Sequence, residues 1–178
     1  CSFVSYTSSR LLSLIPEYLD RLLKDIDTNF RIINDLGLNL KTVYIGGGTP
    51  SILTEEQLVD LLGCMNEHLP KEHLLEFSFE AGRPDTITEG KLHILKEHGV
   101  DRISVNPQTT NDEVLRGIGR KHSVADFFEV AQKALTELLP ACREVDPDND
   151  GFLMASGIIL SAMAADDVLT SLEKKFVC

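Results

Sequence analysis

A strand-like segment followed by a helical pattern occurs three times in succession, and this repetition most constrains the fold. The strand-like segments are residues 41–45, 75–80 and 102–105, which are short and rich in apolar and β-branched side chains. Amphipathic helical patterns follow each of them, and a long one precedes the first over residues 11–36. Strands separated by helices pair in parallel through right-handed crossovers. We therefore expect an α/β fold whose sheet is covered on both faces or closed as a barrel.

Turn and capping signals mark the ends of these elements. Gly37 follows the first helical pattern, and the capping-box sequence Thr-Glu-Glu-Gln at 54–57 begins the next one. Further helices are expected over about residues 88–98, 111–118 and 123–139, and the last of these ends before a proline. The chain therefore alternates helix and strand over most of its length.

The composition and charge restrict the kinds of partner. The chain has 178 residues, 43% of them hydrophobic, which suits a single domain with a substantial apolar core. Its formal net charge of -11 opposes non-specific binding to nucleic acid or anionic membranes, because such partners attract concentrated Lys and Arg. No apolar run is long enough to span a bilayer, and no secretory leader opens the chain. We therefore expect a cytoplasmic protein with no nucleic-acid partner and no membrane span.

Glycines and polar residues stand at each junction between a strand and the following helix. The residues at these junctions are Gly46, Gly47, Gly48, Thr49, Pro50, Glu80, Asn106 and Gln108, and Arg120 and His122 at the start of the next unit are candidates to join them. Each alone also fits an ordinary role as a tight turn, a cap, a loop amide or a surface charge. Parallel strands bring their carboxyl ends to one rim, however, so the joint occurrence favours a small-molecule site. The set offers backbone groups for an amino group, a carboxylate and an amide for hydroxyls, and a guanidinium for a carboxylate.

The cysteines and an acidic stretch allow two further interpretations. Cys64 lies in an amphipathic helical pattern and is interpreted as a small buried hydrophobe, since the chain contains no Cys-x-x-Cys pair. The acidic run Asp146 to Gly151 resembles the start of an EF-hand loop, although Gly157 stands where Glu is expected. The alternatives there are a calcium-binding module or an acidic turn. Residues 152–163 fit either a strand or a helix.

Four motifs together resemble a known enzyme family. They are Tyr-Ile-Gly-Gly-Gly-Thr-Pro-Ser at 44–51, Glu-Ala-Gly-Arg-Pro-Asp-Thr-Ile at 80–87, Arg-Ile-Ser-Val-Asn-Pro-Gln-Thr at 102–109 and Gly-Arg-Lys-His at 119–122. In order and spacing they resemble the radical S-adenosylmethionine (radical SAM) enzymes of the oxygen-independent coproporphyrinogen III oxidase group. The second and third motifs are most similar to the coproporphyrinogen dehydrogenase branch of bacteria such as Firmicutes. The resemblance covers roughly residues 1–137.

This resemblance implies a fold, two cofactors and a set of binding residues. The fold would be an incomplete parallel (β/α) barrel, and the cofactors a [4Fe-4S] cluster and S-adenosylmethionine. The implied reaction is oxidative decarboxylation of the porphyrinogen substrate coproporphyrinogen III to protoporphyrinogen IX in haem biosynthesis, with an electron donor as a further partner. The family pattern assigns Gly46 to Pro50 to the methionine amino group, Glu80 and Gln108 to the nucleoside or methionine moiety, and Arg120 to the carboxylate. A haem-binding or haem-delivery protein of the same fold is the alternative.

The family's cluster motif, Cys-x3-Cys-x2-Cys followed by an aromatic residue, is only partly present. Cys1 matches the third cysteine and Phe3 the aromatic residue, while the first two cysteines are missing. Three thiolates are needed to hold such a cluster, so we expect a fragment of the enzyme that is inactive alone. On this interpretation residues 1–140 form the barrel core, and residues 141–178 are a divergent or truncated continuation.

Overall fold

The computed structural model describes residues 12–70 and 72–143. The helices are α2 (Ile15–Asp35), α3 (Glu55–His68), α4 (Glu89–Glu97), α5 (Asp112–Gly117) and α6 (Val124–Arg143). The strands are β1 (Thr42–Ile45), β2 (Glu76–Ala81) and β3 (Arg102–Val105), and two short 3-10 helices are η1 (Pro50–Ile52) and η2 (Pro84–Thr86). This order confirms the predicted alternation of helix and strand.

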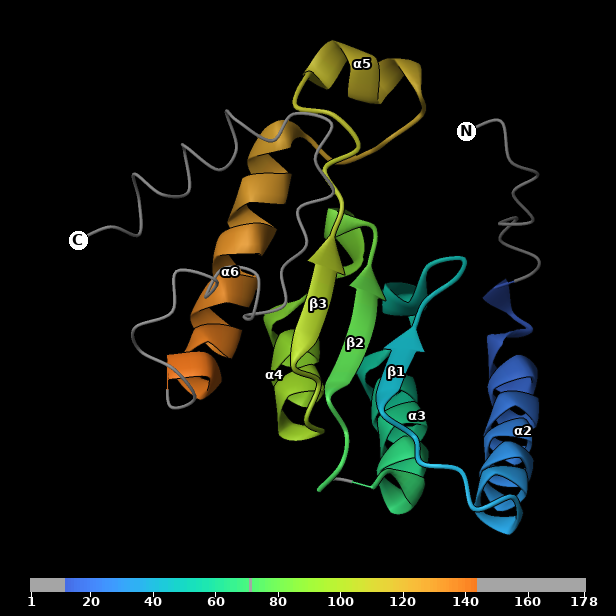
Figure 1. The fold of residues 1–178 in the computed structure, drawn as a ribbon. Coiled ribbons are helices and arrows are strands. Elements are labelled where there is room, and N and C mark those ends of the chain that lie inside the picture. Colours follow the sequence, from blue (N-terminus) through green and yellow to red (C-terminus); the bar gives the residue numbers. More distant parts are fainter. Residues whose placement is uncertain (1–11, 71, 144–178) are drawn as a thin grey trace.

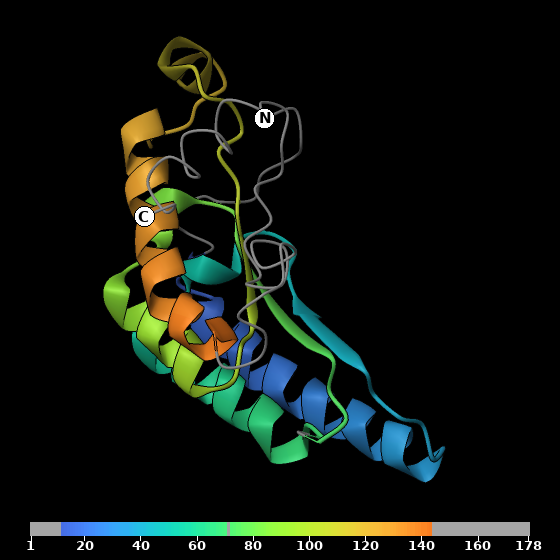
Figure 2. The same cartoon turned by 60° about the vertical axis from the view of Figure 1, so that its left-hand side comes forward.

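The three strands form one parallel sheet in the order β1-β2-β3 (Figure 1). Thr42 pairs with Glu76 across the first strand pair, and Ser78 pairs with Arg102 across the second. All three carboxyl ends therefore lie at the same edge of the sheet, as the sequence predicted. Helices α2, α3, α4 and α6 lie on one face of this sheet, whereas α5 stands beyond the carboxyl end of β3 (Figure 1, Figure 2). Of the two alternatives left open by the sequence, cover on both faces is not seen within the described residues, and a sheet that is part of a barrel agrees with helices on one face.

Alternation along the strands builds the core. On β2 the apolar residues Phe77, Phe79 and Ala81 are buried, and on β3 so are Ile103 and Val105. These five side chains share a hydrophobic cluster with residues of the helical layer, among them Leu58, Leu62, Leu92, Leu95, Phe127 and Ala131. The residues between them on each strand point to the other face, because side chains alternate with a period of two. One face of the sheet therefore carries the core and the other carries polar groups.

The sequence signals for helix ends correspond to local hydrogen bonds in the structure. Gly37 adopts φ 63°, and the Leu38 N–H then donates to the Ile33 carbonyl, which closes α2 in the manner expected of a glycine stop. The predicted capping box at α3 is present: the Gln57 N–H donates to Thr54 Oγ1, and the Thr54 N–H donates to Gln57 Oε1. Each signal fixes the start or end of a helix that flanks β1.

The last helix differs from its predicted end. We predicted that it ends before Pro140, whereas α6 continues to Arg143. A proline beyond the first turn of a helix removes one backbone hydrogen bond and usually ends or kinks the helix, so the continuation of α6 past Pro140 departs from that rule. Cys1, Phe3, the acidic run at 146–151 and the residues after 151 lie outside the described residues, and the division at residue 140 stays a prediction. No helix in the described part is long and apolar enough to cross a membrane.

Candidate functional site

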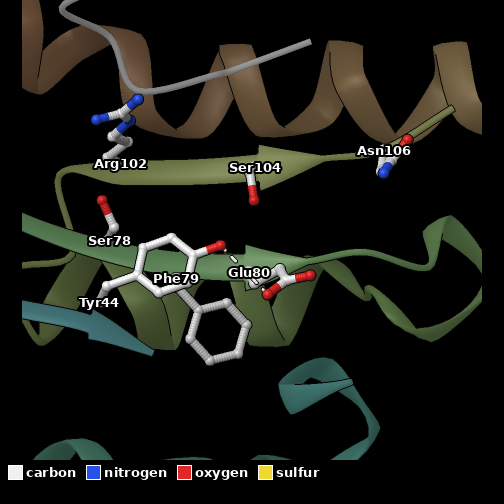
Figure 3. A pocket seen from close by; sticks show the side chains of 7 residues that line it. All are labelled: Tyr44, Ser78, Phe79, Glu80, Arg102, Ser104 and Asn106. Carbon is white, nitrogen blue, oxygen red and sulfur yellow. Dashed lines mark hydrogen bonds between the residues drawn. The ribbon is translucent and has the colours of Figure 1, made fainter. Parts of the chain in front are cut away.

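A polar cavity of about 230 Å³ lies on the face of the sheet opposite the helices (Figure 3). Its lining comes from all three strands and the residue after β3: Tyr44, Ser78, Phe79, Glu80, Arg102, Ser104 and Asn106. All but Phe79 are polar, and most stand at alternate positions along their strands. The cavity therefore forms because every second side chain of each strand points to this face of the sheet.

Glu80 connects the ends of β1 and β2. Its Oε2 accepts hydrogen bonds from Tyr44 Oη and from the Gly47 N–H, each at 3.2 Å. The structure thus brings the predicted glycine run and the predicted carboxylate together. Tyr44 was not among the predicted site residues, although its position two residues before Gly46 is the period that places a strand side chain on one face. Partial burial and the negative charge of Glu80 raise the pKa of Tyr44, so the phenol stays protonated and donates.

Two glycines at this junction are required for different reasons. A Cβ at Gly46 would lie 2.1 Å from Tyr44 Cε1 and 2.8 Å from Glu80 Oε2, so the tyrosine ring occupies the space that a side chain would need. Gly47 adopts φ 116°, a conformation that L side chains rarely adopt, and in it the Gly47 N–H points to Glu80. The glycine run therefore lets backbone and carboxylate meet at the rim.

A partly buried lysine holds the loops after β1 and β2 together. Lys91 of α4 donates through Nζ to the Ser51 and Thr86 carbonyls, both at 2.8 Å, and Ser51 Oγ lies 2.5 Å from Thr86 Oγ1. Burial lowers the pKa of Lys91, and the carboxylate of Glu55 opposes that shift. The predicted residues Thr49 and Pro50 directly precede Ser51, one of the residues that Lys91 contacts. Thr49 Oγ1 donates to the Gly48 carbonyl, and Pro50 begins η1. Sequence patterns gave no signal for Lys91.

The loop after β3 has a strained backbone at a predicted site residue. Gln108 adopts φ 64°, which is uncommon for a residue with a side chain, and its N–H donates to Asn106 Oδ1 at 2.9 Å. Asn106 lines the cavity, whereas Gln108 is not among the lining residues. His122 is buried beneath this loop, with Nε2 3.5 Å from the Pro107 carbonyl. Within the described residues its Nδ1 has no hydrogen-bond partner.

Arg120 contributes a cationic group near the loop after β2 and does not line the cavity itself. Burial and the neighbouring Arg83 lower the pKa of Arg120, while the carboxylate of Asp85 opposes the shift. An arginine remains charged under such a shift, so two guanidiniums and one carboxylate leave net positive charge there. This charge suits an anionic group such as a carboxylate.

The fold and the site define a class. Parallel strands with helices outside, and a polar site on the inner face near the carboxyl ends, are the features of a (β/α) barrel segment with a small-molecule site. The Radical SAM superfamily model matches residues 1–141. The chain therefore belongs to the radical SAM superfamily, which implies in general a [4Fe-4S] cluster and S-adenosylmethionine.

Individual relatives are connected with haem metabolism. The oxygen-independent coproporphyrinogen-III oxidase-like protein HemZ of Bacillus subtilis (strain 168) is 35% identical over 130 residues, which are 72% of this chain and 26% of HemZ. The heme chaperone HemW of the same organism is 47% identical over 97 residues, 54% of this chain and 25% of HemW. The chain thus spans about a quarter of the length of these curated relatives.

A solved structure agrees with the family. Coproporphyrinogen III oxidase (HemN) from Escherichia coli, described as a radical SAM enzyme, superimposes with a TM-score of 0.59 at 25% identity. The match covers 73% of this chain and 29% of that structure. The predicted fold class, an incomplete parallel (β/α) barrel of the radical SAM type, is confirmed, and so is the resemblance to the coproporphyrinogen oxidase family.

Proposed function

We propose that this chain is the S-adenosylmethionine-binding part of a radical SAM oxidoreductase that converts coproporphyrinogen III to protoporphyrinogen IX. The observation that carries the proposal is the junction at Glu80, where a carboxylate, a glycine N–H and a tyrosine hydroxyl meet at the ends of two parallel strands. Superfamily membership supports the cofactor, and the name of HemZ together with the name and fold of HemN supports the substrate.

The chemistry of the described residues fits S-adenosylmethionine. Glu80 uses Oε2 for the two contacts within the chain, which leaves Oε1 as an acceptor for a ligand hydroxyl or ammonium. A Cβ at Gly47 or Gly48 would meet nothing within 4 Å, so these two glycines leave space at the rim where a small ligand could approach the backbone. The positive charge at Arg120 and Arg83 complements a carboxylate. We assign these groups to the methionine end and the ribose of the cofactor.

The bound cluster and S-adenosylmethionine would supply a 5′-deoxyadenosyl radical that removes a hydrogen atom from a substrate propionate. The described residues act on binding and orientation. Glu80, fixed by Tyr44 and Gly47, orients the cofactor at the rim, and Lys91 holds the two loops that carry the rim residues. Cys1 and Phe3 are proposed as the third cluster ligand and its neighbouring aromatic residue. Gln108 is proposed to contact the nucleoside from the strained loop after β3.

The reaction is tested with the complete natural protein that carries this chain, reconstituted anaerobically with iron and sulfide. We expect formation of protoporphyrinogen IX together with stoichiometric 5′-deoxyadenosine, and loss of both products in Glu80→Gln. The matched control is Glu76→Gln, which changes the same residue type on the same strand and should keep the activity. Formation of 5′-deoxyadenosine without any protoporphyrinogen IX would contradict the assigned substrate.

A haem chaperone is the second candidate, because HemW shares 47% identity with this chain over 97 residues. The two functions separate in one pair of measurements on the complete protein. An oxidase forms protoporphyrinogen IX, whereas a chaperone takes up haem stoichiometrically and forms none. The second outcome would replace the oxidase assignment by haem delivery.

A further inference from the structure

Three side chains with metal-binding chemistry meet between α2 and α3, in the helical layer behind the sheet. Asp27 comes from α2, and Cys64 and His68 come from α3. One potential ligand atom from each lies within 4.8 Å of the others. His68 Nε2 is 2.7 Å from Asp27 Oδ1, and Cys64 Sγ is 3.9 Å from the same oxygen. One carboxylate oxygen therefore faces both a thiol and an imidazole nitrogen.

Local structure arranges this cluster in advance. Cys64 and His68 are four residues apart on α3, so the helix presents both on one face. The ring of Phe30 stacks on the ring of His68, with centroids 4.9 Å apart and an interplanar angle of 16°. Phe30 is itself buried in the core, so the stacking holds the imidazole with Nε2 directed at Asp27. The side chains of His68 and Asp27 remain 25% and 42% exposed, which leaves a path for an ion from solvent.

A role as a reactive cysteine does not fit this arrangement. An activated thiolate needs a cationic neighbour, whereas Cys64 faces the carboxylate of Asp27. Burial, Asp27 and Glu67 all raise the pKa of Cys64, so the thiol is protonated in the absence of a cation. The interpretation of Cys64 as a buried hydrophobe is also incomplete, because the residue is only partly buried and lies among polar groups. A cation between the three side chains would satisfy all of them together.

We propose that Asp27, Cys64 and His68 form a binding site for a divalent transition-metal ion, with Zn²⁺ as the best match. Sulfur, nitrogen and oxygen donors together suit a borderline-soft ion and not Mg²⁺ or Ca²⁺, which prefer oxygen. Zinc–ligand distances of about 2.0–2.3 Å place tetrahedral ligand atoms roughly 3.4–3.6 Å apart. The separations of 2.7 and 3.9 Å from Asp27 bracket this range, and the third, between His68 and Cys64, is within 4.8 Å, so side-chain shifts of about 1 Å would complete the geometry.

Three protein ligands leave a fourth position for water. The ion would join α2 to α3, two helices that also meet through apolar side chains, among them Leu19 with Leu61 and the buried Phe30 with the ring of His68. Because β1 follows α2 in the chain, a metal ion that links α2 to α3 would also help to fix the position of β1, the strand that precedes the glycine run. The site is separate from the cavity, which lies on the opposite face of the sheet. It does not depend on the proposed cofactor or substrate.

The test is zinc titration of the purified chain against a competing chromogenic chelator, together with Co²⁺ absorption spectroscopy. We expect one zinc per chain and a thiolate-to-cobalt charge-transfer band. Cys64→Ser and His68→Gln should each weaken zinc binding by more than about 100-fold, since even outer groups around a metal matter by about 10–100-fold. Matched controls are His93→Gln, an exposed histidine paired with Glu97, and Cys178→Ser. Both controls should bind zinc like the parent chain.

A second measurement needs no variant and therefore does not depend on the variants folding. Zinc should slow the alkylation of Cys64 by iodoacetamide, measured by peptide mass spectrometry, and leave the alkylation of Cys178 unchanged. Absence of zinc binding, equal affinity in Cys64→Ser, a loss shared by the two controls, or unprotected Cys64 would each overturn the proposal.

Discussion

The two faces of the three-stranded sheet are made by the same strands and serve different purposes. On β2 the helix-facing Phe77 is 1% exposed and belongs to the main core cluster. Its neighbour Ser78 and the next alternate residue, Glu80, line the polar cavity instead. Adjacent residues of one strand therefore have different roles: one packs in the core, and the next lines the cavity. Substitutions one residue apart should consequently separate folding from ligand binding.

The largest effect on stability is expected from truncating a core side chain on the helix-facing side of the sheet. Phe77→Ala should lower the free energy of unfolding by about 3–5 kcal/mol, because a large buried side chain is replaced by a cavity. Urea denaturation followed by circular dichroism measures this change. The control on the polar face is Ser104→Ala, for which we expect a change within about 0.5 kcal/mol. Similar losses in both variants would show that the two faces are not distinct.

The next effect concerns the lysine that links the core side to the loops of the site. Lys91→Met should destabilise the chain by about 2 kcal/mol, since the Ser51 and Thr86 carbonyls lose their donor. It should also weaken S-adenosylmethionine binding, because both loops carry rim residues. Thermal and urea unfolding measure the first effect. Lys24→Met, on an exposed face of α2, should change stability by less than about 0.5 kcal/mol, and an equal loss there would refute the special role of Lys91.

A change confined to the polar face should affect binding more than folding. Gly46→Ala puts a methyl group where the ring of Tyr44 lies, so the ring must move and release Glu80. We expect S-adenosylmethionine affinity to fall about tenfold, as measured by equilibrium dialysis. Gly63→Ala in α3 is the matched control, because a Cβ there meets nothing within 4 Å. It should raise stability by about 0.5–1 kcal/mol and leave binding unchanged.

The smallest effect is a pH dependence at the start of β2. Hydrogen bonds from Ser78 and Arg102 lower the pKa of Glu76 below its ordinary 4.5. A carboxyl group whose pKa is lower in the folded state stabilises the fold above its unfolded pKa and loses that contribution as the pH falls. Stability should therefore decline below about pH 4.5, and Glu76→Gln should flatten the decline. Urea midpoints measured from pH 3 to pH 7 test this, and identical slopes in both proteins would contradict it.

The order of elements was predictable because its signals are local. Strand periodicity, the glycine stop at Gly37 and the capping box at Thr54 each depend on a few neighbouring residues. The approach of the glycine run to Glu80 was also predictable, since adjacent parallel strands end at one edge. Arg120 lies close to Arg83, a second cation that the sequence did not single out, and its assignment to a ligand carboxylate stays a prediction.

Other features depend on packing between distant segments and had no sequence signal. Lys91 reaches two loops from α4, and the side chain of Tyr44 turns onto Glu80 across a strand pair. Likewise, Asp27 meets Cys64 only because α2 packs on α3. Periodicity indicates which face of a helix is buried, but it does not give the partner or the rotation of that face. These contacts therefore required the structure.

The central claim, that the polar face binds S-adenosylmethionine through Glu80, is tested most directly by equilibrium dialysis of labelled S-adenosylmethionine. The complete protein that carries this chain, with its cluster reconstituted, should bind one equivalent, and Glu76→Gln, on the same strand and face, should bind equally well. Glu80→Gln should bind at least about tenfold more weakly, since a charged hydrogen bond contributes about 1.5–3 kcal/mol. Equal binding by Glu80→Gln and the parent protein would contradict the account.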